Sequence, residues 1–299
     1  MANFRLISGI SNIGASNKVP LGLEFELKDG WKIYWRNPGD AGYPPEMSFK
    51  NNDNLSEIKW FWPAPKRFIF EDMQNFGYEK KIIFPITAIL KTPKEPLVLQ
   101  ANITALACKD ICVPIDGSLN LTIPVGNPVK TEHAASIYSF KKRVPTKSTW
   151  PGFKILSVNA NKNSILIKVK SKHALVKPDV FIESENGFRF GKPEVSISNN
   201  RLNASFILSN DIPIDTNLAG IPITITVVDG KKSIEVRRSI HGKLVTKPVQ
   251  SYTSFNWLTV LLAALIGGLI LLARRSNGMP GGPGPVSYTH LTLPTKRIV

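Results

Sequence analysis

Cysteine is scarce in this chain: its 299 residues contain two cysteines, four histidines and four methionines. The two cysteines, Cys108 and Cys112, lie four positions apart. A tetrahedral zinc site needs more ligands than this pair supplies, and the nearest histidine in the sequence is His133. No methionine lies beside the pair, so a copper site with Cys108 and Cys112 as soft ligands is a minor alternative.

The spacing of the pair also argues against a purely structural disulfide. So close a pair closes a very short loop, and it therefore removes little entropy from the unfolded chain. A chain of 299 residues is long enough to bury a full core without such a bridge. The pair favours thiol–disulfide exchange or metal binding, and a structural disulfide stays open as an alternative.

A concentrated basic patch is also missing. The formal net charge is +16, but lysine and arginine are scattered along the chain. The sequence has no basic helix, no aromatic signature of RNA binding and no zinc-finger spacing. We therefore expect a solvated basic surface and no nucleic-acid partner.

Long apolar runs are absent except for one near the C-terminus. The start of the chain has no apolar segment of the signal-peptide type, so we expect either a cytosolic protein or a natural start that has been removed. Residues 257–273 (WLTVLLAALIGGLILLA) carry no charge and can begin a bilayer-spanning helix. We predict the start of a transmembrane helix at 255–273, with a buried core helix as the alternative.

The residues around this run predict an orientation. Arg274 and Arg275 follow it, and the positive-inside rule then places residues 1–250 outside the cytoplasm, in a bacterial periplasm. Residues 276–285 are of low complexity, and VSYTHLTLPT at 286–295 resembles a translated sequencing-adapter sequence. We interpret residues 274–299 as a non-native tail, a view that weakens the argument from the arginines.

Alternating apolar and polar residues in the first domain, 1–126, predict half-buried strands, most clearly at 21–28 and 97–108. Asp29-Gly30 is a hairpin signal and predicts that 21–28 pairs with the strand from residue 31. Cys108 ends the strand 97–108, and the next strand is expected at 119–125. Many short strands at this spacing indicate a β-sandwich.

After a short helical region, the rest of the chain again shows the pattern of short, half-buried strands. Residues 127–149 are predicted to be a linker that contains a helix at 131–142 and bridges two domains. Residues 150–248 form the second β-sandwich domain, with a second hairpin signal at Asp229-Gly230. This domain has no cysteine and no cluster of titratable groups, so we interpret it as a spacer or docking domain.

Four motifs in the first domain carry a resemblance to a known family. They are DGWKIYWRNPGDAG at 29–42, WPAP at 62–65, FGY at 76–78 and CKDICVP at 108–114. They resemble the N-terminal periplasmic domain of the DsbD and ScsB family of transmembrane thiol:disulfide reductases. Residues 255–269 resemble the start of that family's first membrane helix. The resemblance implies an all-β chain of two immunoglobulin-like sandwiches and a partial transmembrane helix.

The resemblance also implies an electron relay. The first domain would act as a thiol:disulfide oxidoreductase with the redox-active disulfide Cys108–Cys112 and no other cofactor or metal. It would pass reducing equivalents from the family's membrane and thioredoxin-like domains, which this chain lacks, to periplasmic thioredoxin-like partners. By family analogy, Cys112 attacks and links to the partner, while Cys108 resolves the mixed disulfide.

The family shields its cysteines with an aromatic residue on a cap loop. The matching segment here is 70–78, in which Phe76 is the first candidate for the cap, with Tyr78 and Phe70 as further candidates. The alternative is that these are ordinary aromatics at the edge of the sandwich. For the whole chain, the alternative function is a membrane-tethered, immunoglobulin-like binding module with a structural disulfide.

Overall fold

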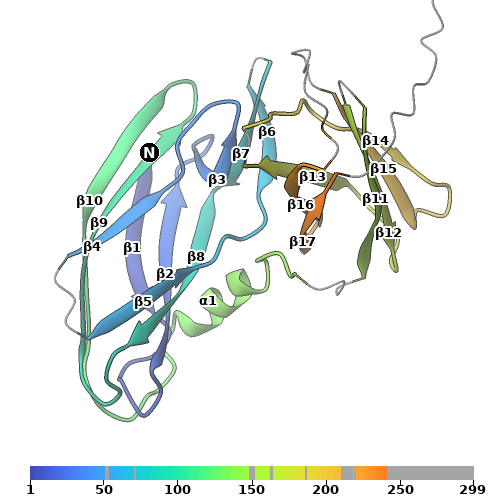
Figure 1. Cartoon of the computed structure of the whole chain (residues 1–299). Coiled ribbons are helices and arrows are strands. Elements are labelled where there is room, and N and C mark those ends of the chain that lie inside the picture. The colour runs from blue at the N-terminus through green and yellow to red at the C-terminus, as the bar shows by residue number, and fades with distance from the viewer. Residues whose placement is uncertain are drawn as a thin grey trace, which may run out of the picture. The chain divides into compact units, whose positions relative to one another are not determined.

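The structure is a computed structural model. It describes residues 1–240, except 51–53, 71, 148–151, 162–163, 186, 210–217 and 219. Figure 1 shows strands almost throughout, with one short helix among the described residues. The all-β class predicted from the sequence is confirmed.

The first sandwich has two antiparallel sheets. One has the order β1-β2-β8-β5, and the other has the order β10-β9-β3-β7-β6, with β4 also paired to β9. The strands are β1 (Ala2–Ser8), β2 (Lys18–Leu27), β3 (Lys32–Gly39), β4 (Glu46–Lys50), β5 (Leu55–Trp60), β6 (Lys66–Phe70), β7 (Met73–Glu79), β8 (Lys81–Leu90), β9 (Leu97–Cys108) and β10 (Cys112–Ile123).

The alternation in β9 explains how this sandwich forms its core. All residues of one face, from Leu97 through Ile103 to Ala107, are buried, while residues of the other face are exposed or half-buried up to Leu106, and only the last of them, Cys108, is buried. Such a period of two is what a strand with one face on the core requires. The buried face packs with apolar residues of β2 and β8 from the opposite sheet.

The predicted hairpin at Asp29-Gly30 is wrong. The chain does turn there, because Gly30 has a φ of +81° and the backbone N–H of Trp31 donates to the carbonyl oxygen of Lys28 at 3.0 Å. However, β2 pairs with β1 and β8, whereas β3 pairs with β7 and β9. Both strands bury their apolar faces in one core from opposite sheets. The turn signal specifies a change of direction and does not specify the pairing partner.

The second sandwich also has two antiparallel sheets, β11-β12-β15-β14 and β13-β16-β17. Its strands are β11 (Phe153–Asn161), β12 (Ser164–Ser171), β13 (Pro178–Ser184), β14 (Glu194–Ile197), β15 (Asn203–Ser209), β16 (Pro222–Asp229) and β17 (Lys232–Ser239). The hairpin predicted at Asp229-Gly230 is confirmed, because Asp229 pairs with Lys232 across β16 and β17.

Helix α1 (Ala134–Lys141) lies within the predicted range 131–142. It does more than connect two domains. Ile137 and Phe140 are buried in the core of the first sandwich, where α1 packs against β8 and β2. The helix therefore belongs structurally to the first sandwich.

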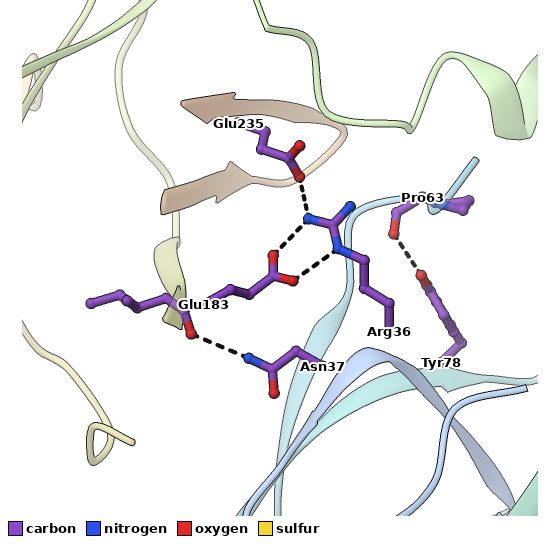
Figure 2. Close-up of polar contacts among 7 residues, drawn as sticks. Arg36, Asn37, Pro63, Tyr78, Glu183 and Glu235 are labelled. Atoms are coloured by element: carbon purple, nitrogen blue, oxygen red, sulfur yellow. Dashed lines mark hydrogen bonds and ion pairs between the residues drawn. The ribbon is translucent and has the colours of Figure 1, made fainter. Parts of the chain in front are cut away.

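The sandwiches share contacts through β13. Phe181 belongs to the first core, where its ring centroid lies 5.9 Å from that of Trp35 and 4.9 Å from that of Phe76. Polar contacts surround this ring. Figure 2 shows the guanidinium of Arg36 paired with the carboxylates of Glu183 and Glu235, and the side-chain amide of Asn37 donating to the carbonyl oxygen of Ile182.

The predicted membrane segment 255–273 and tail 274–299 lie outside the described residues. Within the described part of the chain, no helix has the length and apolar character needed to cross a bilayer.

Glu24 in β2 is a charged group inside the first sandwich, with 3% of its side chain exposed. Burial by itself raises the pKa of this carboxyl, but hydrogen bonds and charge from Lys81 at 2.7 Å and Arg5 at 2.6 Å outweigh it, so the pKa is lowered. The resulting stabilisation is present above the unfolded-state pKa of 4.5 and is lost as the pH falls through the lower folded-state pKa.

We therefore expect Glu24→Gln to lower the free energy of unfolding at pH 7 by about 1–3 kcal/mol. Between about pH 5 and pH 2, the variant should lose stability less steeply than the wild-type protein. Urea unfolding at a series of pH values measures both effects. Parallel pH profiles of the two proteins would contradict the assignment.

Candidate functional site

The two cysteines form a disulfide at the end of the β9–β10 hairpin. Cys108 is the last residue of β9, Cys112 is the first of β10, and the two are register partners with Cα atoms 4.1 Å apart. The backbone N–H of Lys109 donates to the carbonyl oxygen of Ile111 at 3.0 Å, which closes the loop between them. The bond therefore links neighbouring ends of two strands that already pair.

The strand after the pair begins at Cys112, earlier than the predicted 119–125. Pro114 and Gly117 interrupt the alternation that would have marked it. β10 lies at the edge of its sheet, and an edge strand tolerates proline because one row of its backbone groups has no ladder partner. The cysteines are consequently joined by a tight loop.

The two sulfur-bearing residues differ in exposure. Cys108 is 8% exposed, whereas Cys112 is exposed and the loop residue Ile111 is 69% exposed. A thiolate from another protein can therefore reach Cys112 more readily than Cys108. This asymmetry agrees with the order of attack that the family resemblance implies, although the roles of the two cysteines stay a prediction.

Tyr34 of β3 lies against the buried cysteine. Its hydroxyl donates to Sγ of Cys108 at 2.9 Å and lies 3.7 Å from Sγ of Cys112. Burial raises the pKa of Tyr34, so the hydroxyl remains protonated and able to donate at neutral pH. Gly42, with a φ of +111°, packs on the Tyr34 ring, and a Cβ atom there would overlap the ring.

A cavity of about 130 Å³ lies beside the disulfide. The disulfide loop and β3 form part of its wall, and the rest comes from the hairpin of β6 and β7, residues 66–79, which we name the cap hairpin. Phe68 and Asn75, a cross-strand pair of this hairpin, both line the cavity. The ammonium of Lys32 lies 5.2 Å from the centroid of the Phe68 ring.

Charged residues of both signs border the cavity. Lys32 and Lys109 line it together with one acid, Asp110, whose carboxylate is 4.0 Å from the Lys109 ammonium. Cationic side chains near a cysteine lower its thiol pKa and so increase its thiolate fraction. Lys32 and Lys109 act in this direction, whereas the carboxylate of Asp110 opposes them.

The candidates for the cap fall in different surroundings. Phe76 borders the disulfide cavity, but its ring packs on Phe181. Tyr78 is buried, with its ring 5.3 Å from that of Phe84 and its hydroxyl donating to the carbonyl oxygen of Pro63 at 2.6 Å (Figure 2). The backbone of Phe70 ends β6, and its side chain lies outside what the structure describes. The cap assignments stay predictions.

Sequence reasoning missed Tyr34 and Phe68 as site residues. Tyr34 lies in the motif at 29–42, on the polar face of the alternating pattern there. A tyrosine among charged residues on that face was the sequence feature that could have marked it as a site residue. Phe68 carried no signal of its own, because its position depends on which strands pair. Among the described residues, no group of three or more histidine, cysteine or acidic side chains is placed to hold a metal ion.

Comparisons with known proteins identify the families that the two sandwiches match. Residues 9–124 match the family model "Thiol:disulfide interchange protein DsbD, N-terminal", and residues 143–243 match a domain of unknown function, DUF8393. No curated protein sequence matches the chain.

Two solved structures are similar to the chain. The N-terminal periplasmic domain of ScsB from Proteus mirabilis is 23% identical with a TM-score of 0.66, over 81% of this chain and 94% of that one. The reduced N-terminal domain of Neisseria meningitidis DsbD is 14% identical with a TM-score of 0.24, over 41% of this chain and 90% of that one. The ScsB match supports the predicted immunoglobulin-like fold. By its family match over residues 9–124, the first sandwich belongs to the DsbD N-terminal domain family.

Proposed function

We propose that the first sandwich passes reducing equivalents to oxidised periplasmic thioredoxin-like proteins through Cys108 and Cys112. The observation that carries this proposal is the asymmetric disulfide, in which Cys112 is exposed and Cys108 is buried against the Tyr34 hydroxyl. A periplasmic location and a membrane relay that supplies the electrons belong to the same proposal. They rest on the family match and on the sequence motifs.

The chemistry proceeds by two sulfur exchanges. In the reduced protein, the Cys112 thiolate attacks a sulfur of the partner's disulfide, and the other partner sulfur leaves as a thiolate. The Cys108 thiolate then attacks Sγ of Cys112, which re-forms the Cys108–Cys112 bond and releases the second partner sulfur. Two electrons have moved to the partner, whose thiolates take up protons from solvent.

Re-reduction runs through the same atoms in reverse. A donor thiolate attacks the exposed Sγ of Cys112, and Cys108 leaves as a thiolate. The Tyr34 hydroxyl, which lies 2.9 Å from this sulfur, can donate to the developing negative charge. A second donor thiolate then releases Cys112 by attacking the mixed disulfide at the donor's own sulfur.

The redox equilibrium of the purified protein with glutathione tests the proposal. We expect a midpoint between about −120 and −270 mV, the range of exchange proteins. Thiol alkylation followed by mass measurement reports the reduced fraction. A disulfide that stays oxidised below about −300 mV, the range of structural bridges, would contradict the proposal and leave a binding module with a structural disulfide.

Single-cysteine variants test the roles of the two sulfurs. Cys108→Ala leaves the exposed Cys112, and we expect it to form a stable mixed disulfide with an oxidised thioredoxin-like protein because no second thiolate resolves it. Cys112→Ala leaves the buried Cys108 and is the matched control, which should form little adduct. Non-reducing gel electrophoresis measures both. Equal adduct formation would overturn the assignment of Cys112 as the linking cysteine.

Tyr34→Phe tests the hydroxyl. A hydrogen bond to a charged group contributes about 1.5–3 kcal/mol, and about 1.4 kcal/mol changes a rate tenfold. Reduction of the disulfide by a fixed concentration of glutathione at pH 7 should therefore slow roughly tenfold. Tyr138→Phe, on the helix and 62% exposed, is the control with no expected effect. An unchanged rate for Tyr34→Phe would show that the hydroxyl does not assist the leaving thiolate.

A further inference from the structure

The cap hairpin has two faces with different neighbours. Cross-strand partners share a face of a sheet, so Phe68 and Asn75 lie on one face, and Arg67 and Phe76 lie on the other. The Phe68 face borders the cavity beside the disulfide. The Arg67 face meets β13 of the second sandwich, because the Phe76 ring packs on Phe181 and Arg67 binds residues of β13.

The hairpin lies at the edge of its own sheet. β6 is the last strand of the order β10-β9-β3-β7-β6, so the hairpin is attached only through β7. The ladder between β7 and β3 is regular at 32–34, and then its register shifts until Gly39 pairs with Asn75. Beyond this shift, Asp40 exchanges two hydrogen bonds of 2.8 Å with the backbone of Gln74, and the backbone N–H of Ala41 donates to the side chain of Asn75 at 3.3 Å. The contacts with the second sandwich add to these.

Arg67 connects the cap hairpin to strand β13 of the second sandwich. Its side chain is 8% exposed, and its guanidinium donates to both carboxylate oxygens of Asp179 at 3.1 and 3.0 Å and to the carbonyl oxygen of Val180 at 2.7 Å. The same guanidinium lies 4.8 Å from the Phe76 ring centroid and 4.9 Å from that of Phe181. A planar guanidinium can make bidentate and stacking contacts together, which a lysine cannot.

Gln74 adds a second link from the same face. It is buried, it accepts a hydrogen bond from Arg67, and its side-chain amide donates to the carbonyl oxygen of Phe190 in the second sandwich. A cavity of about 320 Å³ borders Arg67, Gln74 and Phe190. The polar contacts of Arg67 and Gln74, together with the contact between the Phe76 and Phe181 rings, therefore connect the hairpin to the second sandwich beside this cavity.

We propose that the second sandwich positions the cap hairpin beside the disulfide, with Arg67 as the positioning residue and Asp179 as its anchor. The proposal rests on the proposed function, since it concerns access to the disulfide that carries out the exchange. It gives the second sandwich a role in the exchange reaction that a spacer does not have. Opening of the hairpin breaks the Arg67–Asp179 pair, and the pair therefore limits how often small thiols reach the cysteines.

The test is the rate at which dithiothreitol reduces the disulfide of the native protein, read by alkylation and mass. Arg67→Ala and Asp179→Ala should each raise the rate about tenfold, the change that about 1.4 kcal/mol in the opening equilibrium produces. The double variant should be no faster than either single variant, because both remove the same pair. If Arg67→Ala fails to fold, Asp179→Ala carries the test.

Two matched controls separate positioning from general loosening. Glu183→Ala removes a partner of Arg36, which joins the same two sandwiches from β3 and not from the cap hairpin. Lys66→Ala removes the exposed ion pair with Glu79 at 2.6 Å, which lies on the hairpin but does not reach the second sandwich. Both should leave the rate unchanged, and in guanidinium all variants should be reduced equally fast.

The measured rates either support or contradict the positioning role of Arg67 and Asp179. Unchanged or slower reduction in Arg67→Ala and Asp179→Ala, or equal acceleration in Glu183→Ala, would overturn the positioning role while the wild-type disulfide still equilibrates with glutathione. A disulfide that resists glutathione in the wild-type protein would remove the proposed function itself, and the positioning role with it. The glutathione equilibrium and the dithiothreitol rate thus distinguish the two failures.

Discussion

The burial of β13 from both sides is the constraint on which the rest of the molecule depends. Val180 and Ile182 belong to the core of the second sandwich, while Phe181 between them contacts Trp35 and Phe76 of the first. Successive side chains of a strand point to opposite faces, so β13 can bury both faces only while the two sandwiches remain in contact. The cap hairpin, the core of the first sandwich and the second sandwich therefore meet at one ring.

The site combines one accessible sulfur with one protected sulfur. The accessible Cys112 can join to another protein, and the protected Cys108 can act as a leaving group beside a hydroxyl that burial keeps protonated. These are the demands of an exchange reaction, in which attack on the wrong sulfur or by the wrong thiol must be avoided. Lys32, Lys109 and Asp110 bring charges of both signs to the same cavity.

Local patterns predicted the parts of the fold that depend on local physics. Alternation identified β9 and its buried face, every second residue from Leu97 to Ala107, and the position of Cys108 at its end followed from the same pattern. Pairing between strands that are distant in the sequence has no comparable local pattern. The Asp29-Gly30 turn was recognised but its strands were assigned to each other, and the start of β10 was missed because Pro114 and Gly117 interrupt the alternation. The sequence motifs identified the cysteines as the site. The neighbours of Phe68 and Arg67 could not be predicted, because they depend on where strands β6 and β13 lie in the fold.

The disulfide lies at the end of a ladder that does not need it. Residues of β9 and β10 pair without interruption from Cys108–Cys112 to Leu97–Ile123, so backbone hydrogen bonds hold the two strands in register when the sulfur–sulfur bond is open. The ladder of β9 and β10 is therefore independent of the bond between their ends. Under the proposed function, exchange at this pair would then require little rearrangement of the strands that carry it.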